Sequence, residues 1–487
     1  MRRLCRRLLG LLTPLALTAC AATSAPRDTA ASPGTGRVTA GSTAASHPGE
    51  SRAPLPWDTD PFPSTYKPYA GAPTLVRDVT IFDGEGGRID HGAVLFAQGK
   101  IIQVAQDIEP PPDAVVIIAT GKWITPGIID IHSHMGDYPV PSTASLSDGN
   151  ELTSPVTAEV WAEHSVWPQD AEFSRALAHG GVTTIQVLPG SGNLFGGRSV
   201  VLKLVSGRTV QEMKFPGAPY GLKMACGENP ETVYGAKGRM PSTRMGNIAL
   251  DRITWSKAVE YKKKWEDYEK NGGTPPSRDL QLDTLAGVIA GKILVHNHCY
   301  RADDMAQVID MSKEFGYHVA AFHHAVEAYK VADLLAANHI CSAVFAEQVP
   351  FKMEAVDGIP ENLALLYQAG ACVMTHSDSG VFVQMLNLEV AKMVAAGRRM
   401  GIDIPDAVAW EFLSYNPAKA LGIADRTGSL RPGKMADVVL WNGNPFSSYS
   451  RPEKVWIDGA LMYDILNPKL HPIADFELDN PGDEDVK

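Results

Sequence analysis

The stretch Ile124–Gly136, ITPGIIDIHSHMG, decides how the rest of the chain is interpreted. Its isoleucines are β-branched and closely spaced, which is typical of a parallel strand buried on both faces, and a Pro-Gly pair marks the entry. His132 and His134 follow two positions apart, so both imidazoles share one face of the strand and can converge on a metal ion. A pair of polar histidines that simply hydrogen-bond to their neighbours is the alternative that this spacing leaves open.

Length and charge narrow the class of function. The chain has 487 residues, enough for a large core and a smaller second unit. Its 44 Lys and Arg against 55 Asp and Glu give a net charge of -11. That balance, without a basic stripe, argues against nucleic acid as a partner and favours a small-molecule substrate.

Residues 1–20 are predicted to be a lipoprotein signal peptide. Arginines precede a short apolar run that is too short to span a bilayer, and Leu17-Thr18-Ala19-Cys20 resembles a bacterial lipobox. We therefore expect Cys20 to be the lipid anchor of an exported protein that faces the periplasm or the cell exterior, with no other membrane contact. An ordinary cleaved signal peptide and an uncleaved start are the alternatives, and Sec and twin-arginine export both stay open.

Composition and periodicity divide the rest of the chain. Residues 21–70 are rich in small and polar residues and are predicted to be a flexible linker. Residues 71–124 and 425–470 contain short β-type runs that we expect to pair into one satellite sheet, and residues 471–487 are predicted to be an acidic tail.

Residues 125–424 alternate strand and helix patterns, close to eight times, which favours an α/β fold with a closed (β/α)8 barrel over a doubly wound sheet. A polar helix is predicted near residues 247–271, most simply as an exposed cover helix, with a substrate lid as the alternative. Four cysteines in apolar strand-like runs are interpreted as buried thiols and not as disulfides: Cys226, Cys299, Cys341 and Cys372.

Several later strands also end in possible metal ligands. These residues are His296 and His298, His323 and His324, and His376 and Asp378. Active sites of barrels of this kind gather at the carboxyl ends of the strands, so the side chains are expected to meet. Together with His132 and His134, they predict a metal centre.

The motifs PGIIDIHSH, HSDS and NPAKALG, followed by GSLRPGKMADVVLW, resemble those of the amidohydrolase superfamily, closest to its imidazolonepropionase-like and prolidase-like branch. The resemblance covers about Leu75 to Asp464. It implies a (β/α)8 barrel that holds one or two divalent metal ions, usually zinc, and a β-sandwich built from both flanks.

The resemblance also implies a ligand set. His132 and His134 match the ligands of the first strand, His324 matches a ligand of the sixth, and Asp378 matches the aspartate of the eighth. His298 matches the ligand of the fifth strand, and His296 is the second choice. His323 is then expected beside the site.

The residue that would bridge two metal ions is the one position at which the sequence does not match the family pattern unambiguously. The run GLKMACGENP contains both Lys223, which resembles the carboxylated lysine of the prolidase-like branch, and Glu228, which lies nearer the strand end. The match to Lys223 is slightly preferred. The alternatives are a lysine that pairs with a nearby acid and a glutamate that begins the next helix, so the number of metal ions stays open.

These residues predict hydrolysis of an amide-type C–N bond in a dipeptide, an N-acyl amino acid or a cyclic amide. A divalent ion lowers the pKa of water, Asp378 acts as the general base, and His296 or His376 helps to polarise the carbonyl. The alternatives are a one-metal deaminase of the same superfamily and a substrate-binding lipoprotein without catalysis.

Substrate recognition is expected in the loops that follow the strands. Tyr234, Arg239 and Arg244 are candidates for binding a substrate carboxylate, with a solvated loop as the alternative. The glycine-rich run Ser191–Gly197 approaches a ligand with its backbone or forms a plain turn. The sequence is compatible with a homo-oligomer and does not identify the substrate or the metal.

Overall fold

The computed structural model describes residues 54–346 and 351–472. Its central sheet contains eight strands that follow one another in sequence order. They are β6 (Ile128–Ser133), β7 (Val182–Val187), β8 (Phe195–Lys203), β9 (Gly221–Ala225), β10 (Leu294–Cys299), β11 (Val319–His324), β12 (Cys341–Val344) and β13 (Cys372–Thr375).

The first and last strands of this sheet meet, so that the sheet forms a nearly closed barrel. The backbone N–H of Asp378, just after β13, donates to the carbonyl of His132 on β6 at 3.1 Å. The N–H of Ser377 donates to the side chain of Asp130 at 3.1 Å. The predicted α/β fold class, a barrel with a satellite sheet, is confirmed.

One barrel strand runs against the prediction of an all-parallel sheet. β8 pairs antiparallel with both β7 and β9. The reason is the short connection of residues 188–194, because a parallel neighbour would need a crossover of a dozen or more residues. The glycine-rich run Ser191–Gly197 is therefore the turn of a hairpin and the start of β8.

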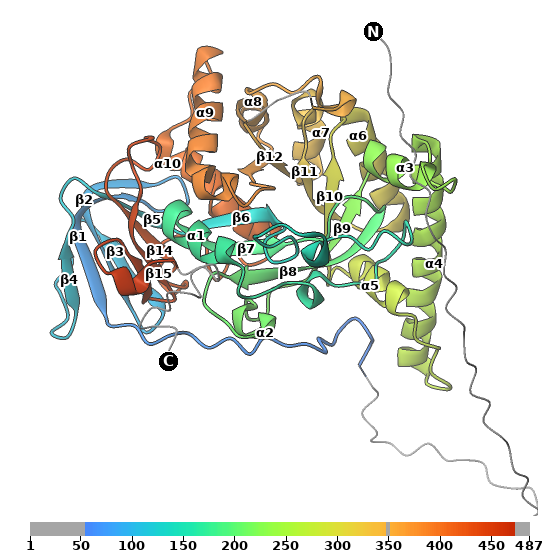
Figure 1. Cartoon of the computed structure of the whole chain (residues 1–487), viewed down its shortest axis with the longest axis horizontal. Helices are drawn as coiled ribbons and strands as arrows, with labels where there is room; N and C mark the ends of the chain where they lie inside the picture. Colours follow the sequence, from blue (N-terminus) through green and yellow to red (C-terminus); the bar gives the residue numbers. More distant parts are fainter. Residues whose placement is uncertain (1–53, 347–350, 473–487) are drawn as a thin grey trace, which may run out of the picture. The chain divides into compact units, whose positions relative to one another are not determined.

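Helices connect and cover the barrel strands (Figure 1). They are α1 (Ala171–Gly180), α2 (Val210–Met213), α3 (Glu228–Gly235), α4 (Arg244–Asn271), α5 (Leu280–Ile289), α6 (Ala302–Phe315), α7 (Ala332–Ala337), α8 (Asn362–Gln368), α9 (Leu386–Arg399), α10 (Asp406–Ala409) and α11 (Tyr415–Ala420).

The predicted polar cover helix is α4. It begins where the side chain of Thr243 accepts a hydrogen bond from the N–H of Gly246, and it ends at Gly272, whose φ of 72° suits a residue without a Cβ. Trp255 and Trp265 lie on its buried face. No helix within the described residues is long and apolar enough to cross a membrane.

The two flanks of the barrel build the second sheet, as predicted. The strands coloured blue and red in Figure 1 lie together in it, and they come from opposite ends of the described chain. In spatial order, the path is β16 (Ala460–Asp464), β15 (Pro452–Ile457), β14 (Val438–Trp441), β5 (Trp123–Pro126), β1 (Thr74–Phe82), β2 (Arg88–Ala97) and β3 (Lys100–Ala105), with β4 (Val115–Ile118) paired to β1. β5 and β14 are paired antiparallel, so Thr125 lies opposite Val439 at the point where the chain passes into the barrel.

Part of the predicted linker of residues 21–70 lies within the described residues and packs against the rest of the chain. Leu55 and Trp57 are buried in an apolar cluster with Tyr261 and Trp265 of α4. Tyr66 donates a hydrogen bond to Asp458. Large apolar side chains give this part the surface to bury that residues 21–53 lack. The predicted signal peptide, Cys20, the first part of the linker and nearly all of the acidic tail lie outside the described residues.

The interpretation of the four cysteines as free thiols is wrong. Disulfides join Cys226 to Cys299 and Cys341 to Cys372, with Cα–Cα distances of 5.3 and 4.4 Å. Cys341 and Cys372 lie opposite each other on neighbouring parallel strands, and Cys226 directly follows β9, beside the end of the parallel strand β10 that carries Cys299. Apolar surroundings indicate burial correctly, but the partner of a buried cysteine depends on strand register, which the sequence does not show.

Candidate metal centre

The predicted ligands gather at one end of the barrel. Most lie at or just beyond the carboxyl end of a strand, Lys223 and His296 lie in the middle of theirs, and most are buried. They are His132 and His134 from β6, Lys223 from β9, His296 and His298 from β10, His323 and His324 from β11, and His376 and Asp378 after β13. Separate segments thus contribute to one cluster, as the barrel topology predicts.

Two overlapping groups within the cluster have the spacing of a metal site. Ligand atoms of His132, His324 and His376 all lie within 4.8 Å of one another, and so do those of His132, His134 and Asp378. His132 belongs to both groups. The arrangement therefore fits one ion or two neighbouring ions that share this side of the barrel.

Burial keeps the imidazoles neutral. It lowers the pKa of His132, His298 and His324 well below the ordinary value, and nearby Lys223 acts in the same direction. Burial also lowers the pKa of His296 to about 3 and that of His376 to about 4. A neutral imidazole has a free lone pair, which is the form that binds a metal ion.

His323 connects two histidines of the cluster. Its Nδ1 lies 3.0 Å from Nδ1 of His132, and its Nε2 lies 3.0 Å from Nδ1 of His296. This contact occupies Nδ1 of His132, so that Nε2 of the same ring faces the cluster. That Nε2 lies 3.4 Å from Nε2 of His134. This geometry agrees with the expected place of His323 beside the site. Its hydrogen bond to His132 fixes the orientation of the His132 ring.

Several buried ring nitrogens lack hydrogen-bond partners within the described part of the chain. Both nitrogens of His298 and of His376 are in this state, as is Nε2 of His296. Buried polar atoms without a partner are costly, and a divalent ion would satisfy them. The residues present therefore fit a metal ion. His296 keeps Nε2 free although its Nδ1 is bonded to His323, and His298 keeps both nitrogens free, so each histidine of β10 retains a nitrogen for an ion. His298 stays the choice that the resemblance implies.

Lys223 and Glu228, the two candidates for a bridging ligand, occupy different surroundings. Lys223 is fully buried, and its Nζ lies 3.2 Å from Nε2 of His132. Burial lowers its pKa to about 8, against the opposing charge of Asp378. Glu228 begins α3, and its carboxylate pairs with Lys352 at 3.4 Å. Of the two side chains, the structure brings Lys223 into the histidine cluster.

Asp378 is the acidic member of the cluster. Its Oδ1 lies 3.3 Å from Nε2 of His134 and 3.7 Å from Nε2 of His132. Partial burial raises its pKa, but the hydrogen bond and charge of His134 outweigh burial and lower it to about 2. The residue has a φ of 49°, in the left-handed region that side chains other than glycine rarely adopt. Such strain at a cluster of polar groups is typical of a functional position.

Asp130 supports the cluster and was not among the predicted site residues. It is fully buried and accepts hydrogen bonds from the N–H of His132 at 3.2 Å and from both the N–H and the hydroxyl of Ser377. Burial raises its pKa to about 7. It therefore ties the ligand-bearing end of β6 to the segment that carries Asp378. A carboxylate inside an apolar strand was the signal that could have found it.

The three predicted substrate-binding residues have partners within the protein. Tyr234 is fully buried, with its hydroxyl 2.6 Å from the carbonyl of Ser154. Arg239 donates to the carbonyl of Thr153 at 2.9 Å, and Arg244 pairs with the carboxylates of Asp304 and Glu354. Binding of a substrate carboxylate stays a prediction for Arg239 and Arg244. Tyr234 has no exposed surface with which to contact a substrate.

Comparison with known proteins agrees with this geometry. The model of the amidohydrolase family matches residues 282–470. The amidohydrolase tasK of Hapsidospora irregularis is 31% identical over 446 residues, which are 83% of this chain but only 45% of that protein, so the chain spans about half of its length. An imidazolonepropionase of Mesorhizobium japonicum is 24% identical over 398 residues, covering 75% of this chain and 90% of that one.

A solved structure matches over its whole length. The crystal structure of an amidohydrolase from Thermotoga maritima MSB8 is 36% identical, with a TM-score of 0.74, and the match covers 80% of this chain and 100% of that one. The resemblance found in the sequence motifs is thereby confirmed. The chain belongs to the amidohydrolase superfamily.

Proposed function

We propose that the protein is a metal-dependent hydrolase that cleaves an amide-type C–N bond in a small molecule. The observation that carries this proposal is geometric: ligand atoms of histidines from separate barrel segments lie together with the carboxylate of Asp378 at one end of the barrel. Family membership supports the same reaction class. The substrate we propose is a dipeptide, an N-acyl amino acid or a cyclic amide.

The residues of the chain divide the reaction between them. His132, His134, His298 and His324 would hold the ion, which supplies a Lewis acid that polarises a carbonyl and acidifies water. The carboxylate of Asp378 would accept a proton from the attacking water and return it to the leaving nitrogen. We assign His376 to the substrate carbonyl oxygen, to which its neutral ring would donate a hydrogen bond. The ligand atoms of His376 also lie close to those of His132 and His324, so coordination of the ion is the alternative role.

Lys223 is our proposed additional ligand. As an amine its Nζ competes poorly for a metal ion, but its lowered pKa raises the fraction of neutral amine that can react with carbon dioxide. The new N–C bond forms as the nitrogen releases one proton to solvent, and the resulting carbamate would be an anionic oxygen ligand beside His132. We propose that this modified Lys223 allows the centre to hold two ions, usually zinc in this superfamily.

The function is tested by combining metal analysis with a substrate screen. Dipeptides, N-acyl amino acids, cyclic amides and amino-substituted heterocycles are supplied to the metal-loaded protein, and amine, carboxylate and ammonia release are measured. Hydrolysis of an amide supports the proposal. Ammonia release from heterocycles alone would replace it with deamination, and no turnover in the screen by a protein that binds metal would favour a binding function.

Asp378→Asn provides the sharper version of this test. The substitution keeps the size of the side chain and removes the proton acceptor, so we expect turnover to fall by about 10² to 10⁴-fold while folding and metal content are largely retained. Asp425→Asn is the matched control, because the side chain of Asp425 is 77% exposed. An unchanged rate in Asp378→Asn would refute the assignment of the base.

We also propose that the protein is exported and anchored through lipid on Cys20. The two disulfides support this proposal, because disulfides form and persist in oxidising compartments and are rare in the cytosol. Labelling cells with a fatty-acid analogue tests the anchor: the wild-type chain is expected to carry the label and Cys20→Ser to lose it. Label that persists in the variant would contradict the proposal.

A further inference from the structure

We propose that the Cys226–Cys299 disulfide is a positioning element of the metal centre, so that its loss loosens the hold on metal as well as lowering stability. The inference rests on the proposed function, because it requires the histidine cluster to bind an ion. The disulfide acts through the residues next to it and does not contact the ion.

Its two cysteines flank predicted ligands on two strands. Cys226 follows the end of β9, the strand of Lys223, and Cys299 directly follows His298 at the end of β10. The N–H of Cys226 donates to the carbonyl of His298 at 2.9 Å. The covalent bond thus fixes the separation of the two strand ends at the level of the ligands.

Cys299 also supports a third strand. It lies opposite His324 in the register of β10 and β11, and its carbonyl accepts the N–H of Ala325 at 3.0 Å. His324 and Ala325 have φ angles of 67° and 41°, in the left-handed region. Residues in that region hold their conformation only when neighbours constrain them. A movement of Cys299 would therefore be passed to the His324 side chain.

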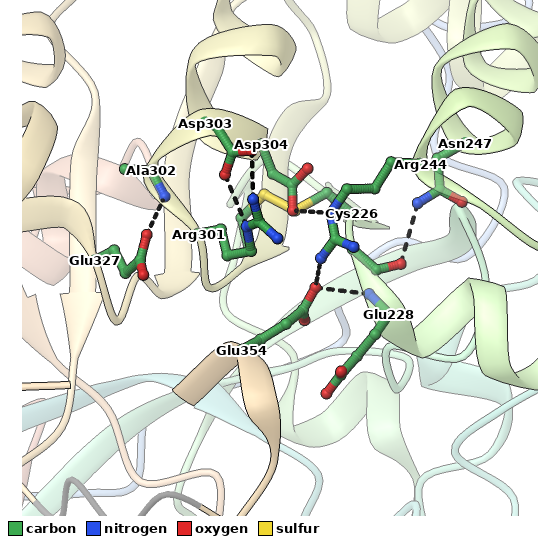
Figure 2. Close-up of a disulfide and its surroundings, with 12 residues drawn as sticks. Cys226, Glu228, Arg244, Asn247, Arg301, Ala302, Asp303, Asp304, Glu327 and Glu354 are labelled. Atoms are coloured by element: carbon green, nitrogen blue, oxygen red, sulfur yellow. Dashed lines mark hydrogen bonds and ion pairs between the residues drawn. A yellow bond between two sulfur atoms is a disulfide. The ribbon is translucent and has the colours of Figure 1, made fainter. Parts of the chain in front are cut away.

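A polar layer ties the same two turns together beside the disulfide (Figure 2). Arg244 pairs with Asp304 at the start of α6 and with Glu354, and Glu354 accepts the N–H of Glu228 at the start of α3 at 2.9 Å. The side chain of Asn247 donates to the carbonyl of Gly227 at 3.0 Å. The turns after β9 and β10 are thus joined twice, by the disulfide and by this network.

The second disulfide provides an internal control. Cys341 and Cys372 are the first residues of β12 and β13 and lie opposite each other in register. They lie at the amino ends of their strands, whereas the ligands lie at the carboxyl ends. The amino-terminal face of such a barrel serves stability. Removing this disulfide should therefore affect folding without a selective effect on metal.

The first experiment compares two double variants of the full chain, Cys226→Ser/Cys299→Ser and Cys341→Ser/Cys372→Ser. Each is loaded with Co²⁺, whose absorption spectrum reports ligand geometry, and is then challenged with a chelator. In the first variant we expect an altered spectrum and metal binding weakened by about 10 to 100-fold, the effect typical of residues that orient ligands. The second variant should retain the wild-type spectrum and affinity. Equal affinity in both variants and the wild type would overturn the inference.

Chemical reduction covers the case in which a variant does not fold. Dithiothreitol transfers two electrons and two protons to each disulfide, giving two thiols, and is itself oxidised to a cyclic disulfide. By linkage, an ion that binds the oxidised form more tightly should lower the fraction of Cys226–Cys299 that is reduced at equilibrium with a given ratio of reduced to oxidised dithiothreitol, but not that of Cys341–Cys372. Alkylation of the thiols after equilibration, followed by mass spectrometry, measures the two fractions separately, with and without Zn²⁺.

The two proposals fail in different ways. A wild-type protein that binds neither Co²⁺ nor Zn²⁺ would overturn the proposed function and, with it, this inference. A wild-type protein that binds metal, but in which Zn²⁺ protects neither disulfide or both to the same extent, would overturn the positioning role alone.

Discussion

Replacing Lys203 with methionine should destabilise the protein more than any exposed charge substitution. Lys203 is fully buried on β8, with its Nζ 2.8 Å from Asp458 and 3.1 Å from Asp437. Both aspartates are buried and belong to the satellite sheet region. Lys203→Met leaves two neighbouring carboxylates without their cation, and loss of one partner of a buried pair costs about 3–5 kcal/mol. The free energy of unfolding should fall by that amount.

Urea unfolding followed by tryptophan fluorescence and circular dichroism measures this loss. Arg252→Met is the control, because the Arg252–Glu314 pair is exposed and should contribute about 1 kcal/mol or less. The triple variant Lys203→Met/Asp437→Asn/Asp458→Asn removes the uncompensated charges and should recover much of the loss. A loss below about 1 kcal/mol in Lys203→Met would refute the claim that the ion pairs of Lys203 with Asp437 and Asp458 stabilise the contact between the barrel and the satellite sheet.

Further predictions concern pH dependence and metal number. Asp251 is buried on α4, and burial raises its pKa well above 3.8. Above pH 3.8 the folded chain therefore keeps a proton on Asp251 that the unfolded chain has released. The free energy of unfolding should fall as the pH rises above 3.8. Asp251→Asn should remove this part of the pH dependence and raise the melting temperature at pH 7; a variant less stable than wild type at pH 7 would contradict the prediction. Lys223→Ala should lower the number of bound ions, whereas Glu228→Gln should not, as measured by plasma emission spectrometry; loss of metal in the glutamate variant alone would exchange their assignments.

The sequence predicts most of the barrel and the identity of its polar cluster. Closely spaced β-branched residues marked the strands, and histidines two apart at a strand end share a face, so His132 with His134 could be placed from spacing alone. The remaining members could be brought together because the carboxyl ends of barrel strands meet. Motif resemblance was needed to choose among neighbouring histidines.

What the sequence did not predict depends on contacts between distant segments. The pairing of Cys226 with Cys299 follows from the register of β9 and β10, and the reversed direction of β8 follows from a connection that is too short for a crossover. The support given by Asp130 depends on Ser377. Asp130 lies on β6, the first strand of the barrel, and Ser377 follows β13, the last strand. No local pattern contains these relations.

Metal content is the most direct test of the account. The full chain is purified, supplied with Zn²⁺, dialysed and analysed by plasma emission spectrometry, in parallel with His132→Ala and the surface variant His91→Ala, whose wild-type side chain is 77% exposed. We predict at least one ion per wild-type chain and per His91→Ala chain, and its loss in His132→Ala, because His132 belongs to both ligand groups. A wild-type chain that retains no metal, or a His132→Ala chain that retains as much as the wild type, would contradict the account.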